Sequence, residues 1–123
     1  MREILFRGKT VKEEWVYGLL SHVGNAWYIS NKAGTPLAYE VIPSTVGQYT
    51  GLTGKNGNKI FEGDIVEYNG TKHEVVFETR GSSAYFGIKI SHIETWQLCL
   101  EVPSKLMKII GNIYDNPELL EVK

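Results

Sequence analysis

Two carboxylates, Glu62 and Asp64, flank Gly63 where the chain passes from a turn into an apolar run. Carboxylates this close together can transfer protons or hold a hard cation such as Ca²⁺ or Mg²⁺. A structural interpretation is simpler, because an aspartate beside a turn glycine commonly accepts hydrogen bonds from backbone N–H groups. We favour the structural interpretation and expect no catalytic residues. An enzyme that uses Glu62 and Asp64 is a remote alternative.

The stretch Gly51–Lys55 has some features of a phosphate-binding loop. That motif requires a glycine five residues before its Gly-Lys pair and a serine or threonine directly after it. Tyr49 and Asn56 occupy these two positions, so the motif fails at both. Asn56-Gly57 is instead typical of a tight turn between strands, since both residues tolerate positive φ.

The histidines and the single cysteine show no metal-binding pattern. His22, His73 and His92 are far apart in the sequence, and one cysteine cannot supply a zinc-binding pair. Cys99 lies in an apolar stretch, which favours a buried thiol in a reducing cytosol over a reactive one. We therefore predict neither a metal nor a cofactor.

Basic and aromatic residues form the remaining candidate site. Side chains of these two kinds on a small barrel can hold single-stranded nucleic acid by stacking and charge. The opposing interpretation is that the aromatics pack in the core while the lysines keep the surface soluble. Thirteen Lys and Arg against fourteen Asp and Glu give a net charge of −1, which disfavours nucleic acid. The candidate surface comprises Tyr49, Lys55, Lys59, Tyr68, Arg80, Tyr85 and Lys89.

The elements that must position these residues are predicted to be short antiparallel strands. Trp15, Tyr17 and Leu19 alternate with other residues and so share one face of a strand. Gly24-Asn25 then marks a turn into a second strand over residues 26–30. This pattern predicts a hairpin near the N-terminus.

A second hairpin is predicted around Asn69-Gly70. On its second arm Val75 and Phe77 share an apolar face, while polar residues occupy the opposite face. In the strand that follows, Tyr85 and Lys89 lie on the polar side of another alternating run. Such alternation is typical of antiparallel strands with one buried face.

Length and composition predict one domain of the mostly-β class. The chain has 123 residues, of which 42% are hydrophobic and 11% aromatic. Its turn signals predict a small antiparallel β-barrel or sandwich, with an SH3-like barrel over residues 63–114 and added N-terminal strands. Asn116-Pro117-Glu118 predicts a short C-terminal helix. We expect a single domain over 1–123, with a possible division into 1–45 and 46–123.

Motifs in the middle and at both ends of the chain resemble those of the YopX family. Two positions depart mildly from the family pattern, since Phe61 stands where tyrosine is common and Gly54 where aspartate is frequent. The resemblance implies a protein encoded by bacterial phages and prophages, and it supplies no catalytic residues. The similar segments are Arg2–Arg7, Gln48–Leu52, Lys55–Gly57, Ile60–Val66 and Ile110–Leu120.

Taken together, these features predict a non-catalytic, self-associating module that binds a host or phage protein. Surplus aromatic residues commonly anchor interfaces, and edge-like strands favour homo-oligomers. A nucleic-acid-binding module is the alternative. No apolar run reaches the length of a membrane span, and the N-terminus lacks the features of a signal peptide. We therefore expect a protein in the cytoplasm of the bacterial host, without contact with a membrane.

Overall fold

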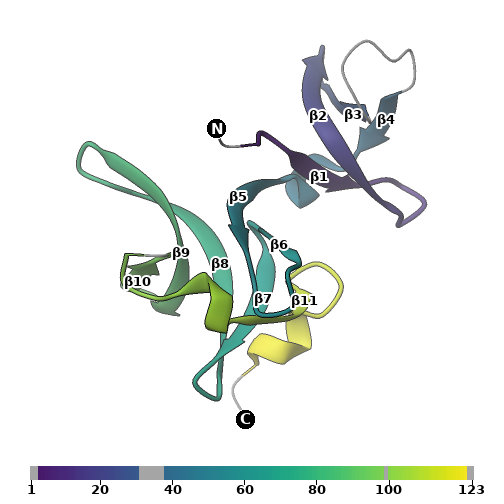
Figure 1. Cartoon of the computed structure of the whole chain (residues 1–123). Helices are drawn as coiled ribbons and strands as arrows, with labels where there is room; N and C mark the ends of the chain where they lie inside the picture. Colours follow the sequence, from purple (N-terminus) through teal and green to yellow (C-terminus); the bar gives the residue numbers. More distant parts are fainter. Residues whose placement is uncertain (1–2, 31–37, 99, 122–123) are drawn as a thin grey trace. The chain divides into compact units, whose positions relative to one another are not determined.

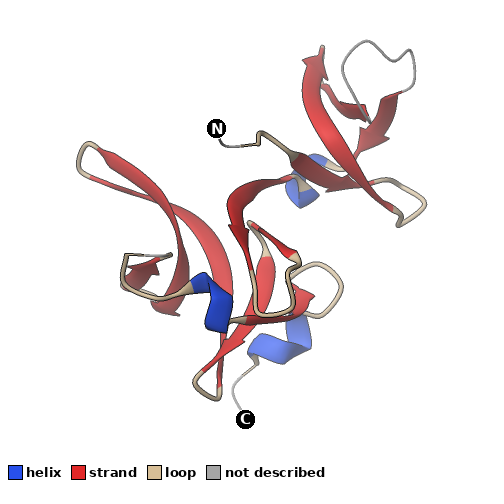
Figure 2. Cartoon of the chain, in the orientation of Figure 1, coloured by secondary structure: helices blue, strands red, loops and turns tan. Residues whose placement is uncertain are grey.

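The computed structural model describes residues 3–30, 38–98 and 100–121. The chain divides into two compact units, residues 1–49 and residues 50–123. Strands form most of both units, and the helical segments are single 3₁₀ turns (Figures 1 and 2). The mostly-β prediction is therefore confirmed. Cys99, predicted to be buried, lies outside the described residues.

The first unit is built on an antiparallel sheet that contains the predicted N-terminal hairpin. Gly24, with φ of 61°, and Asn25 form the two-residue turn between Val23 and Ala26, which pair directly. A positive φ at the first of two turn residues is the pattern of a type II′ hairpin. The elements are β1 (Phe6–Lys9), β2 (Trp15–Val23), β3 (Ala26–Ser30), β4 (Ala38–Val41), the 3₁₀ turn η1 (Pro43–Thr45) and β5 (Gly47–Thr53).

This sheet curls because β4 returns to the end of β1. The backbone N–H of Ile42 donates to the carbonyl of Lys9 at 2.8 Å. Thr45 secures the same junction, since its hydroxyl donates to the Ile42 carbonyl at 2.6 Å and accepts from the Lys9 N–H at 2.9 Å. Gly8 permits the closure, because a Cβ there would lie 2.9 Å from the Cβ of Val41.

The second unit contains a five-stranded antiparallel sheet in the order β10-β9-β8-β7-β11 (Figure 1). Asn69 and Gly70, with φ values of 52° and 78°, form the predicted tight turn between β7 and β8. The other hydrogen-bonded order is β4-β3-β2-β1-β5-β6, and β5 contains the boundary between the units. The remaining elements are β6 (Lys59–Phe61), β7 (Asp64–Tyr68), β8 (Thr71–Arg80), β9 (Ser83–Ser91), β10 (Glu94–Gln97), η2 (Ser104–Leu106), β11 (Lys108–Asn112) and η3 (Pro117–Leu120).

The core of the second unit confirms most of the predicted alternation. Val75 from β8 and Phe86 from β9 are buried in it, while Lys89 is exposed on the opposite face. Phe77 differs, because it stays 46% exposed while its ring contacts Phe86 edge-to-face at 5.0 Å. The buried cluster comprises Ile60, Val66, Val75, Phe86, Ile88, Leu98, Val102 and Met107.

Two details of the predicted fold need correction. The sheet order of the second unit ends at β10 on one side and β11 on the other, so the predicted SH3-like barrel is not shown. The predicted C-terminal helix is only the 3₁₀ turn η3. Asn116 does not cap this turn, because its side-chain oxygen accepts from the N–H of Asn112 at 3.3 Å. In the described ranges, no helix is long and apolar enough to cross a bilayer.

Candidate functional site

The residues of the predicted basic and aromatic surface lie on different elements and differ in their burial. Tyr49 is buried in β5, which removes it from any exposed site. Lys55 lies in the turn before β6, where its backbone N–H donates to the Met107 carbonyl at 2.7 Å. Lys59 is exposed at the start of β6.

The other predicted residues are spread along the second sheet. Tyr68 ends β7 beside the first turn of the sheet and packs against the buried cluster of the second unit. Arg80 ends β8, which has ten residues and therefore spans about 30 Å. Tyr85 and Lys89 follow on β9, where Lys89 is exposed and Tyr85 is half-buried.

The two adjacent carboxylates have separate surroundings. Asp64 is 3% exposed, and its Oδ2 accepts a 2.7 Å hydrogen bond from the N–H of Phe61, as the structural interpretation predicted. Glu62 instead influences the pKa of Glu74 through its charge. Burial raises the pKa of Glu74, Lys89 lowers it, and the charge of Glu62 raises it further. Asp64 thus has a backbone partner at this turn, while the charge of Glu62 bears on Glu74.

The histidines lie on different elements, with His22 in the first unit and both His73 and His92 in the second. His22 stacks on Trp27 with ring centroids 4.2 Å apart, and His92 is exposed after β9. His73 lies on β8 in the second unit. Over the residues that the structure describes, no three His, Cys, Asp or Glu side chains could hold a metal ion together.

An exposed apolar row on β2 is the most distinctive surface of the first unit. We call Tyr17, Leu19 and Val23 the β2 stripe; they are 46%, 39% and 67% exposed. Their odd numbering along one strand places them on the same face. β1 pairs with residues 15–18 of β2, beside Tyr17, and β3 pairs with residues 19–23, beside Leu19 and Val23.

Trp15 continues this face at the start of β2, but cations already engage its ring. The guanidinium carbon of Arg7 lies 4.8 Å from the ring centroid, and the ammonium of Lys9 lies 5.8 Å from it. Cations over an indole face are attracted to its π electrons. Lys9 also lies 4.0 Å from Glu13 in an ion pair, so this end of the row is bounded by charge.

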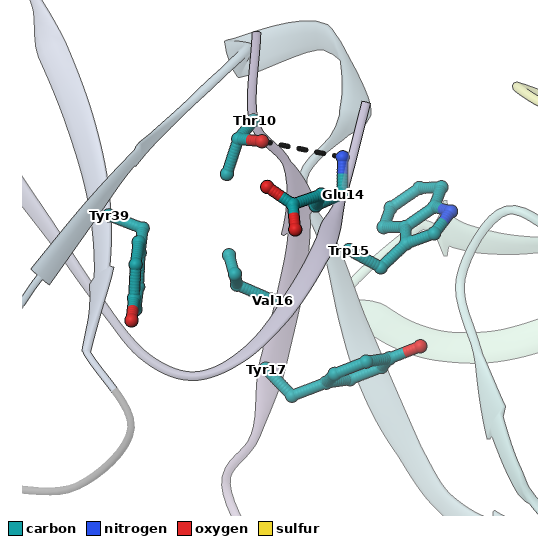
Figure 3. A pocket seen from close by; sticks show the side chains of 6 residues that line it. All are labelled: Thr10, Glu14, Trp15, Val16, Tyr17 and Tyr39. Atoms are coloured by element: carbon teal, nitrogen blue, oxygen red, sulfur yellow. Dashed lines mark hydrogen bonds between the residues drawn. The ribbon is translucent and has the colours of Figure 1, made fainter. Parts of the chain in front are cut away.

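A pocket of about 390 Å³ opens beside the start of β2. Figure 3 shows Val16, Glu14 and Tyr39 on one side of β2, with the rings of Trp15 and Tyr17 turned to the other side. The N–H of Glu14 donates to the Thr10 hydroxyl at 3.3 Å, which shapes the rim. An aromatic wall beside a carboxylate can hold a side chain with an apolar stem and a cationic head.

Tyr39 and Glu14 were not among the residues that the sequence singled out. Fifteen residues separate Tyr39 from the end of β2, and it reaches the pocket because β4 pairs with β3. The alternation of Trp15, Tyr17 and Leu19 did indicate a common face. It did not indicate that this face would remain exposed.

Comparisons with known proteins agree with this fold. The family model described as "YopX protein" matches residues 6–121. A solved structure, protein EF1440 from Enterococcus faecalis, is similar with a TM-score of 0.59 and 23% identity. The match covers 98% of this chain and 100% of that one, and it supports the fold alone. No curated protein matches the sequence. Because the family model spans nearly the whole chain, the protein belongs to the YopX family.

Proposed function

We propose that the protein is a non-catalytic binding module that associates with a second copy of itself through the β2 stripe. The observation that carries this proposal is the exposure of Tyr17, Leu19 and Val23 on one face of β2, where Ser21 lies between Leu19 and Val23. Contiguous exposed apolar residues on a small protein commonly mark an interaction surface. Single exposed apolar residues elsewhere need no such explanation.

A second copy suits this surface for two reasons. The stripe carries no charge, so it can pack against its own image around a two-fold axis. Tyr28 on β3 pairs with Ser21, so it lies on the same face and extends the apolar area beside the stripe.

The stripe alone is too small to be the whole interface. A stable interface buries about 800 Å² on each partner, so neighbouring residues of β1 and β3 must contribute to the rim. In such interfaces a few central residues supply most of the binding energy, and tyrosine is enriched among them. Tyr17 and Leu19 lie next to each other in the stripe and are the expected anchors.

Sedimentation velocity over a range of protein concentrations tests this proposal. The wild type should form a dimer whose population rises with concentration, and Y17S/L19S should weaken association by about a hundredfold. The control is L106S, which removes an exposed leucine from η2 in the other unit and should leave association unchanged. A wild type that stays monomeric would contradict the proposal, as would equal loss of association in the control.

Binding of a host or phage protein stays a prediction, and so does binding of nucleic acid. For a protein partner, the pocket of Figure 3 offers a defined point of contact, because Tyr39 and Glu14 would suit a lysine or arginine side chain. Loss of partner capture in Y39A, with retention in L106S, would support that contact.

A further inference from the structure

A second pocket, of about 290 Å³, lies on the second sheet. Lys72 and Glu74 alternate on one face of β8, and the pairing of Val75 with Ile88 places Glu74 opposite Lys89 on β9. Ser91 and His92 follow at the end of β9, and His73 completes the set of polar residues around the pocket. Two lysines and two histidines thus line a pocket together with a single carboxylate.

His73 is held in place at this pocket by two contacts. Its Nδ1 lies 3.1 Å from the Lys89 carbonyl, which can only accept, so Nδ1 carries a proton. Its Nε2 lies 2.6 Å from the hydroxyl of Thr71, and that hydroxyl also donates to the Tyr68 carbonyl at 2.9 Å. Both ring nitrogens of His73 are thus engaged by contacts within the chain.

The local balance of charge differs from that of the whole chain. The net charge of the protein is −1, whereas the pocket wall has two lysines for one glutamate; Glu67 lies opposite Lys72 on the neighbouring strand β7. Burial raises the pKa of Glu74, which favours its neutral form, while Lys89 opposes this and Glu62 supports it. Focusing positive charge in a concave site raises the local concentration of anions.

We infer that this pocket binds the phosphate group of a small phosphorylated molecule. The ammonium groups of Lys72 and Lys89, the hydroxyl of Ser91 and the imidazole N–H of His92 are suitable donors for phosphate oxygens. The pocket is larger than a phosphate alone, and Ile90 and Leu120 add apolar atoms to its wall. An attached organic group would lie against these two residues. The inference uses the second unit alone and does not depend on self-association through the β2 stripe.

Calorimetric titration at low salt, with inorganic phosphate and with a nucleoside monophosphate, tests the inference. Both should bind in a saturable manner, and the monophosphate should bind more tightly because of its organic group. K72M/K89M should weaken binding by about tenfold or more. E74Q should tighten it severalfold, since it removes the carboxylate that competes with the anion. K105M is the matched control, because Lys105 is exposed on η2 outside the pocket, and it should bind as the wild type does.

Weaker binding by K72M/K89M together with tighter binding by E74Q distinguishes a phosphate bound in this pocket from general attraction of anions to a charged surface. Absence of saturable binding for both probes at millimolar concentration would overturn the inference. Equal binding by the wild type and K72M/K89M would overturn it as well. A single-stranded oligonucleotide without terminal phosphates serves as the further arm. If it binds while the monophosphate does not, the phosphate comes from a nucleic-acid backbone, and the small-molecule assignment is wrong. The E74Q result remains decisive if the lysine variant fails to fold.

Discussion

The buried carboxylate of Asp64 accepts a 2.7 Å hydrogen bond from the backbone N–H of Phe61, at the turn that joins β6 to β7. The same turn is held by two backbone bonds of Gly63, whose N–H donates to Val75 and whose carbonyl accepts from Ile113. The turn therefore connects β7, β8 and the segment after β11. Asp64 thus has a structural role in the second unit.

Replacement of Asp64 by alanine should destabilise the second unit by about 2 kcal/mol, because the buried N–H of Phe61 loses its acceptor. D64N should cost less, since an amide oxygen can still accept the bond. Urea denaturation measures both variants. E67A, which changes an exposed carboxylate on the same strand, is the control and should be nearly neutral. Equal stability of D64A and E67A would contradict the role given to Asp64.

Gly8 is expected to be intolerant of even a methyl group. A Cβ at this position would lie 2.9 Å from Val41 and 3.1 Å from Ile29, both of them buried core residues of the first unit. G8A should therefore lower the free energy of unfolding by about 1–3 kcal/mol through overpacking. Thermal unfolding followed by circular dichroism measures the effect. The control is S21A, which changes an exposed serine on β2. A stabilised G8A protein would show that β4 does not pack on β1 as described.

Glu74 should make the protein less stable as pH rises. Burial raises the pKa of Glu74 above the ordinary value. Between the ordinary and the raised pKa, the folded state therefore binds more protons than the unfolded state. The free energy of unfolding then falls as pH increases from the ordinary pKa through the raised one, and is level above it. E74Q should remove this slope and be more stable than the wild type at neutral pH. Urea denaturation from about pH 4 to about pH 8 measures the difference. If the wild type gained stability relative to E74Q as pH rises, the predicted effect of Glu74 would be wrong.

Local patterns predicted the hairpins and much of the core. Asn69 and Gly70 both adopt positive φ, as a type I′ turn requires. Val75 and Phe86 are buried as their alternation indicated. The Asn56-Gly57 turn was predicted less well, because only Gly57 has positive φ and its N–H closes a turn with the Gly54 carbonyl. In that turn, Gly57 follows the two central residues.

Features that depend on distant segments could not be predicted from the sequence. Asn116 has the side chain of a helix N-cap, but Gly111 leaves room for it beside β11, so it bonds to Asn112 instead. Tyr49 looked like a surface aromatic because its burial depends on tertiary packing that no local pattern encodes. The pockets gather residues from several strands, and strand register is set by long-range pairing.

The central claim is that the β2 stripe joins two copies of the chain, and sedimentation velocity tests it most directly. Wild type and Y17S/L19S would be compared from about 5 to about 200 µM, with circular dichroism to confirm that both are folded. The account predicts a dimer in the wild type that grows with concentration and a folded monomer in the variant. A wild-type monomer across the range, or a dimer that persists in the folded variant, would contradict it.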